Sequence, residues 1–160
     1  MFDSKILIFQ YHIFEEEKIA MNNSLVEYLG SLDDFRYTGA ARKSDVIRAQ
    51  NALRQKFAEE YIAYLLAFGC GSAKYIELTG LNIKRLNVVD ITQFEREEQK
   101  FFPSNMYVVL DKGEEDYLVL QKSDGTVYEL HGSGRIEKIA DSLTDYLKYY
   151  YFLMEEVDAE

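Results

Sequence analysis

The chain has 160 residues, the size of one ordinary domain, and it is long enough to bury a core without disulfide bonds. Hydrophobic residues make up 48% and charged residues 29%, a globular composition that argues against disorder. Acidic residues outnumber basic residues by 28 to 18, and the resulting net charge of −10 argues against a basic nucleic-acid-binding surface.

The N-terminal segment carries a short apolar run, residues 6–9, that polar residues soon interrupt. A secretory signal needs a longer apolar stretch and a small-residue cleavage site, so this run does not resemble a secretory signal. No stretch approaches the roughly 18 apolar residues of a membrane span. The single cysteine, Cys70, excludes an intramolecular disulfide and suits a reducing compartment. We therefore predict a cytoplasmic protein without membrane contact. Because the chain shows no repeat, low-complexity tract or linker, we also predict one domain, over residues 23–160, preceded by an extension of residues 1–22.

The strongest helical signal lies over residues 44–68. Ser44 is a suitable N-cap because its hydroxyl can accept a bond from an unpaired amide of the first turn. Gly69 and Gly71 end the segment, since glycine adopts the left-handed conformation at little steric cost. Apolar residues at steps of three or four predict one buried stripe: Val46, Ala49, Leu53, Phe57, Tyr61, Leu65 and Phe68.

Shorter elements flank this helix. A short helix is expected over residues 23–32, and an extended segment over residues 36–40. Residues 74–79 alternate like a strand. Asp90 is expected to cap a short, charged helix that ends at Gln99.

The second half of the chain changes to β-type patterning. Short β-rich runs cover residues 106–110, 117–121 and 126–130, and Asp124-Gly125 between the last two is a strong hairpin signal. Residues 135–139 add a short strand. These runs predict an α+β fold: a single domain, mainly an antiparallel sheet, with helices packed on one side and a C-terminal helix that closes it.

The closing helix is expected to begin after Ser142, because Asp145 three residues later forms a pair that resembles a capping box. Its predicted core stripe is Leu143, Leu147, Tyr150, Met154 and Val157.

The residues at the joints of these elements form a series of short motifs. They are Gln50-x-x-Leu53, Phe57, Glu60-Tyr61, Tyr64-Leu65, Phe68-Gly69, Phe102-Pro103, Tyr107-Val108-Val109-Leu110, Asp111-Lys112-Gly113, Asp116-Tyr117-Leu118, Gly125-Thr126-Val127-Tyr128, Ile139-Ala140-Asp141-Ser142-Leu143 and Tyr146-Leu147. These motifs and the order of the elements resemble the SUKH superfamily, which includes the yeast Smi/Knr cell-wall regulators and many bacterial immunity proteins. Gln50 stands where an acid is common in that superfamily. Ala58 stands where a proline is common, so the helix is expected to continue with a smaller kink.

The resemblance implies a non-enzymatic protein-binding domain. Many bacterial members of the superfamily are immunity proteins that neutralise a toxin, whereas eukaryotic members resemble signalling scaffolds. Both functions remain open at this level: a bacterial immunity protein, or a scaffold or regulatory module without a toxin. We expect a protein partner, neither nucleic acid nor membrane, and a monomer or weak homodimer.

Candidates for catalysis are few. A nucleophile would need Cys70 or a serine beside His12 or His131. Cys70 follows a helix end, whose partial negative charge raises the pKa of a thiol. The turn after His131 is too short and too poor in bases to bind phosphate. We therefore predict no enzyme activity, no cofactor and no metal site.

Two segments are candidates for partner binding. Asp111, Glu114, Glu115 and Asp116 gather at a hairpin, where they lack the spacing of a calcium loop. They are either a soluble tip that protects a sheet edge or a surface for a basic toxin domain. The last helix carries more aromatic residues than one buried face requires, and these either cap the sheet or contact a partner: Tyr146, Tyr149, Tyr151 and Phe152.

Overall fold

A computed structural model describes residues 23–160 of the protein. Within these residues there are five α-helices and one short 3-10 helix. Their bounds are α2 Ser24–Gly30, α3 Lys43–Leu53, α4 Glu59–Phe68, α5 Val88–Glu98, η1 Gly113–Glu115 and α6 Leu143–Ala159.

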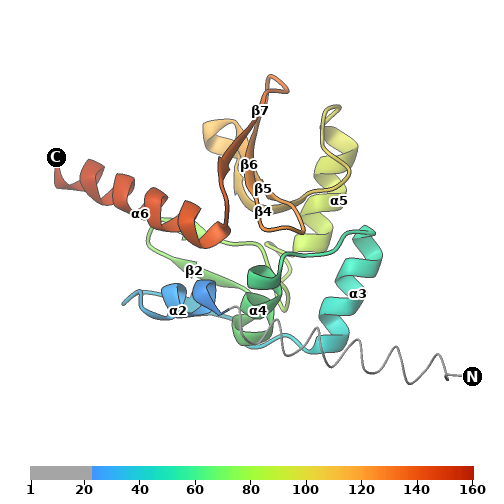
Figure 1. The fold of residues 1–160 in the computed structure, drawn as a ribbon, viewed down its shortest axis with the longest axis horizontal. Coiled ribbons are helices and arrows are strands. Elements are labelled where there is room, and N and C mark those ends of the chain that lie inside the picture. Colours follow the sequence, from blue (N-terminus) through green and yellow to red (C-terminus); the bar gives the residue numbers. More distant parts are fainter. Residues whose placement is uncertain (1–22) are drawn as a thin grey trace, which may run out of the picture.

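The strands form two antiparallel sheets, of order β1-β2-β3 and β4-β5-β6-β7. A single bridge between Leu78 and Leu110 connects the smaller sheet to β4. Figure 1 shows α6 running outward from the end of β7, with α5 on the other side of the larger sheet. The strand bounds are β1 Arg36–Tyr37, β2 Gly71–Ala73, β3 Ile76–Glu77, β4 Tyr107–Lys112, β5 Tyr117–Gln121, β6 Val127–His131 and β7 Ile136–Ala140.

The β-type patterning of the second half is confirmed. Strands β4 to β7 form a meander in which each strand pairs with the next. The predicted hairpin at Asp124-Gly125 is present, with Gly125 at φ +99° and the Asp124 carboxylate accepting from the Thr126 amide at 2.9 Å. Short β-rich runs and the turn residues between them were enough to place these strands.

The prediction of one helix over residues 44–68 is wrong. Helix α3 ends at Leu53, and Arg54 takes the left-handed conformation with φ 50° and ψ 42°. The Gln50 side-chain oxygen accepts from the Phe57 amide at 2.9 Å, which stabilises the turned backbone before α4 begins at Glu59. The apolar stripe is nevertheless buried through Leu65, because two shorter helices bury the same residues on one core.

The predicted caps of two helices also differ. Arg42, not Ser44, is the N-cap of α3, where the Asp45 carboxylate reaches back to the Arg42 backbone amide. Asn87, not Asp90, caps α5, because the Asn87 side-chain oxygen accepts from the backbone amides of Val89 and Asp90. The predicted strand over residues 74–79 is shorter than expected: Lys74 and Tyr75 form the turn after β2, only Ile76–Glu77 form β3, and Leu78 makes a single bridge to Leu110.

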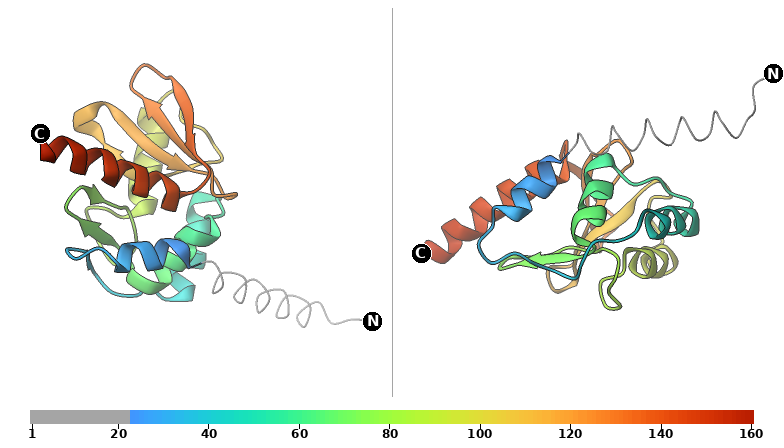
Figure 2. Two further views of the ribbon diagram at one scale, coloured as in Figure 1. Left: turned by 60° about the vertical axis from the view of Figure 1, so that its left-hand side comes forward. Right: turned by 90° about the horizontal axis from the view of Figure 1, so that it is seen from below.

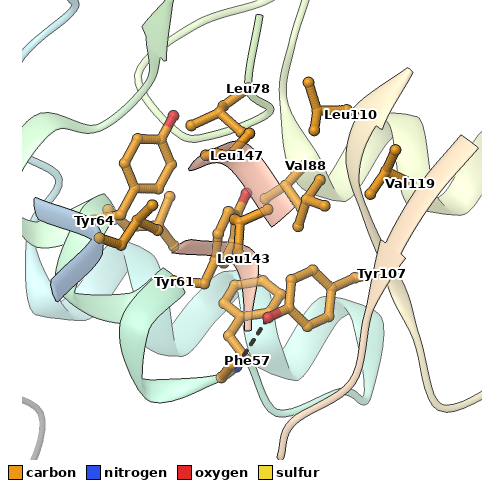
Figure 3. Close-up of a cluster of buried hydrophobic side chains, with 14 of the residues drawn as sticks. Phe57, Tyr61, Tyr64, Leu78, Val88, Tyr107, Leu110, Val119, Leu143 and Leu147 are labelled. Atoms are coloured by element: carbon orange, nitrogen blue, oxygen red, sulfur yellow. Dashed lines mark hydrogen bonds between the residues drawn. The ribbon is translucent and has the colours of Figure 1, made fainter. Parts of the chain in front are cut away.

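The larger core lies between α4, α6 and one face of the main sheet. Phe57, Tyr61 and Tyr107 meet there in tilted or edge-on ring contacts, with centroids 4.7 to 5.2 Å apart (Figure 3). Three buried tyrosine hydroxyls need partners in this apolar setting and find them in Thr79, Gln121 and the backbone. Among the described residues, this core therefore gathers many of the tyrosine and phenylalanine rings of the chain.

The α+β class and the closing helix are confirmed, but the helices are not confined to one side of the sheet. Val108, Leu118 and Leu120 alternate with the larger core's residues and form a second cluster on the opposite face. Ile91 of α5 and Phe102 after it pack against this second cluster. Strands β4 and β5 are buried on both faces, which explains why β4 reads as a continuous apolar run.

Candidate partner-binding surface

The acidic hairpin predicted from the sequence is an exposed tip at the end of β4. All four of its carboxylate residues, Asp111, Glu114, Glu115 and Asp116, are exposed. We call residues 111–116 the acidic tip. Because acidic side chains repel one another, such a cluster is tolerated only where water solvates each charge.

The backbone of the acidic tip is held in place. The Asp111 carboxylate accepts from the Gly113 amide at 2.9 Å, and Asp116 lies in the left-handed region at φ 63°. The Asp116 carbonyl accepts from the Gly132 amide at 3.1 Å, which ties the tip to the turn between β6 and β7. Glu114 and Glu115 are thus presented from a short, fixed 3-10 turn.

Helix α6 begins in the core and then leaves it. Ser142 is its N-cap, and the Ser142 hydroxyl accepts from the Asp145 amide at 3.0 Å, as the sequence predicted. Further along, Lys74 of the β2–β3 turn forms a 3.3 Å ion pair with Asp158, and the Tyr75 hydroxyl donates to the same carboxylate. Figure 2 shows α6 crossing the front of the molecule, with the main sheet above it and the α2 and β2 region below. The N-terminal half of α6 is therefore packed on the domain, and Asp158 attaches its C-terminal end to the β2–β3 turn, although most side chains after Tyr151 are exposed.

The structure separates the aromatic residues of α6 into two groups. Tyr146 and Tyr151 are buried, so Tyr146 is not part of an exposed contact face and the surface prediction is corrected for this residue. Tyr149 is 62% exposed and Phe152 is 58% exposed, so these two predicted residues do lie on the surface. The predicted core residue Val157 is also exposed.

The exposed apolar residues of α6 lie along one side of the helix. They are separated mainly by three or four residues, and since each residue turns the helix by about 100°, this spacing places them on the same side. The four residues are Tyr149, Phe152, Leu153 and Val157. We call these four residues the outer stripe. Leu153 was not predicted from the sequence, although it lies four residues after Tyr149 and therefore on the same side of a helix.

The acidic tip and α6 are neighbours in the structure. The Lys112 ammonium, within the tip, donates to the Tyr150 hydroxyl at 3.0 Å and lies 4.8 Å from the centre of the Tyr150 ring. Burial, and next the Glu115 carboxylate, raise the pKa of the Tyr117 hydroxyl, while a hydrogen bond with Tyr146 offsets part of this. The two surfaces that the sequence presented as separate candidates are therefore joined through α6 tyrosines.

A cavity of about 280 Å³ lies beside the tip, between the β2–β3 hairpin and the end of β4. Its two lysines are already paired: Lys74 with Asp158, and Lys112 with Tyr150. The cavity therefore offers no unpaired cation to an anionic ligand.

The catalytic candidates do not come together. Cys70 is buried, its thiol donates to the Leu78 carbonyl at 3.2 Å, and burial raises its pKa to about 11. His131 lies 3.9 Å from the Glu129 carboxylate and packs on the Tyr117 ring. His12 lies outside the described residues. A buried, protonated thiol is a poor nucleophile, so Cys70 acts here as a core residue.

Residues 23–160 contain neither a metal-binding cluster nor a helix that could span a membrane. No three or more side chains of the metal-binding types His, Cys, Asp and Glu are arranged to hold an ion among these residues. Among the same residues, every helix is too short or too polar to cross a membrane.

The fold defines an α+β domain in which a four-stranded meander is followed by a closing helix. The family model SUKH_6, described as SMI1-KNR4 cell-wall, matches residues 43–147, which is more than half of the chain. The chain belongs to this family, and the resemblance seen in its sequence is confirmed. A comparison with the curated proteins gave no match. The acidic tip lies within the matched residues, and the outer stripe follows them.

Proposed function

We propose that the protein is a non-catalytic, cytoplasmic immunity protein that binds and neutralises a basic toxin domain. Family membership supports a role in protein–protein interaction. The observation that carries the choice of a basic partner is the acidic tip, in which exposed carboxylates are presented from a hydrogen-bonded turn.

The charge distribution favours the same partner. Residues 111–160 hold thirteen acidic and five basic residues, a net charge of −8. An extended negative field attracts a positively charged protein before contact and raises the rate of productive encounter. Each exposed ion pair contributes only about 0–1 kcal/mol, so the tip acts mainly on association and not on the lifetime of the complex.

The first experiment tests neutralisation. The gene would be co-expressed with any toxin-like open reading frame beside it, and growth of the host would be measured with and without the protein. Protection supports the proposal. Binding of a host protein without protection from any neighbouring gene product supports the alternative, a scaffold or regulatory module of the Smi/Knr type.

The second experiment tests the acidic tip with the toxin so identified. The triple variant Glu114→Gln, Glu115→Gln and Asp116→Asn removes three charges, and asparagine tolerates the left-handed conformation at position 116. We expect a lower association rate and a flatter dependence on salt, with little change in dissociation rate or stability.

The matched control removes three exposed acids elsewhere: Asp33→Asn, Glu97→Gln and Glu98→Gln. The control has the same net charge, so it separates the position of the charges from their number. Equal association rates for the two triple variants at low and high salt would show that the tip is only a soluble turn.

A further inference from the structure

The outer stripe of α6 is an exposed apolar surface with no partner among the described residues. Tyr149, Phe152, Leu153 and Val157 are all at least 40% exposed, although α6 has already buried a different face against the domain. Single exposed apolar residues are common, but several aligned on one helix face mark an interaction surface. Tyrosine and phenylalanine also supply large contact areas at low cost in conformational entropy.

The charges on the same side of α6 are all negative. At about 100° per residue, the exposed residues Asp145 and Glu156 fall on the side of the outer stripe, and Glu160 follows the end of the helix. The nearby lysines face other groups: Lys112 is bonded to Tyr150, and Lys148 lies 5.7 Å from the centre of the Tyr28 ring. The stripe is therefore an apolar strip bordered by carboxylates.

A second copy of the chain is a poor occupant for this strip. If two α6 helices packed in an antiparallel arrangement, Asp145 of each would approach the Glu156 and Glu160 region of the other. A parallel arrangement would set each acid against its own copy. Like charges at a contact destabilise it, and the net charge of −10 adds to this repulsion.

We propose that the outer stripe and the adjacent acidic tip form one docking surface for an apolar patch rimmed by lysine or arginine on a different protein. This proposal rests on the proposed function in taking the basic partner as its occupant. It assigns the two parts different roles: the tip accelerates encounter, and Tyr149 and Phe152 determine the lifetime of the complex because their apolar area is desolvated on contact.

The test uses a defined probe that does not depend on finding the toxin: a fluorescent amphipathic helical peptide of leucine and lysine, with a leucine–glutamate peptide of the same pattern as reference. Binding to the full chain is measured by anisotropy at two salt concentrations. We expect the lysine peptide to bind at least tenfold more tightly than the glutamate peptide. The variant Tyr149→Ser with Phe152→Ser is expected to weaken binding of the lysine peptide at least tenfold and to do so mainly through faster dissociation.

The single variant Phe152→Ser has a matched control in Phe94→Ser on α5, because Phe94 is 59% exposed, almost the same as Phe152. The control should leave peptide binding unchanged within twofold. Thermal unfolding of each variant confirms that the domain is intact, which is expected because the replaced rings are exposed.

Three results would overturn the docking surface. The first is equal loss of binding in the α5 and α6 variants, which would show that the peptide recognises no particular apolar site. The second is equal affinity for the two peptides. The third is concentration-dependent dimerisation that Phe152→Ser abolishes, which would make a second copy the occupant. The growth assay tests neutralisation independently, so failure of the toxin proposal and failure of the docking surface give different results.

Discussion

The replacement Glu60→Gln tests how α6 is attached to the rest of the fold. Glu60, near the start of α4, is only 4% exposed. One carboxylate oxygen accepts from the Gln121 side chain and the Leu143 amide, both at 2.8 Å. The other accepts from the Thr144 amide at 3.1 Å and the Thr144 hydroxyl at 2.8 Å. One buried side chain thus joins α4 to β5 and to the first turn of α6.

The loss expected on replacement follows from these four bonds. Glutamine puts an NH₂ group in place of one oxygen, and the least unfavourable orientation turns that group toward Thr144, whose hydroxyl can rotate to accept. The Thr144 amide then remains buried without an acceptor, which costs about 1–3 kcal/mol, and the bonds that remain lose their charge assistance. Removing the negative charge from the N-terminus of α6 adds to the loss. We expect destabilisation of about 2–5 kcal/mol in total.

Urea unfolding followed by circular dichroism measures this value, and thermal unfolding should show a fall in Tm of roughly 5–20 °C. Glu156→Gln on α6 is the control, because it removes the same charge from an exposed position and should change stability by about 0.5 kcal/mol or less. If Glu60→Gln were as mild as the control, the buried carboxylate would not be what attaches α6.

Two further predictions concern the region around Cys70. The Cys70 thiol should resist alkylation at pH 8 in the folded protein and react on unfolding, as measured by mass spectrometry in a urea series. Its pKa in the folded protein, about 11, lies above the ordinary value of a thiol. The contribution of the protonated thiol to stability is therefore present below about pH 8.5 and is lost as the pH rises toward 11. Rapid alkylation without denaturant would contradict this burial. Gly80→Ala should destabilise the fold by about 1–3 kcal/mol or more in the same urea experiment, because the new Cβ would meet the backbone of Gly69 and Cys70. The control is Gly30→Ala, whose Cβ would meet nothing within 4 Å, so this variant should be neutral or slightly more stable.

Part of this protein could be predicted from the sequence because the signals are local. Strands β5 to β7 follow from short β-rich runs and from the turns between them, one of which has an Asp-Gly pair that needs a positive φ. Ser142 was identified as the cap of α6 because a cap involves only its own neighbours in sequence. The acidic tip was found for the same reason, since four acids in one short turn are expected to be solvated wherever the turn lies.

Other features depend on contacts between distant residues. Whether Tyr146 or Tyr149 is buried depends on which side of α6 meets the sheet, and a helix with aromatics around most of its circumference does not reveal that side. The joining of the acidic tip to α6 likewise needs Lys112 and Tyr150, which are 38 residues apart, to meet in space. The adjacency of the acidic tip and α6, on which the proposed docking surface depends, is therefore a property of the folded chain.

The sequence by itself determined where strands, turns and the closing helix occur, because alternation, turn residues and caps act over a few neighbouring residues. Only the tertiary structure decided that the predicted helix ends before Arg54. The apolar residues before and after Arg54 keep the same helical spacing, so that spacing does not reveal the break. The turned backbone is stabilised by the hydrogen bond from the Phe57 amide to the Gln50 side chain, which the apolar spacing does not encode. The tertiary structure also decided the role of Glu60, which resembles a surface acid in the first turn of a helix. The donors that allow its burial come from Leu143 and Thr144, more than 80 residues later, and a charged group is buried only where folding brings such partners to it.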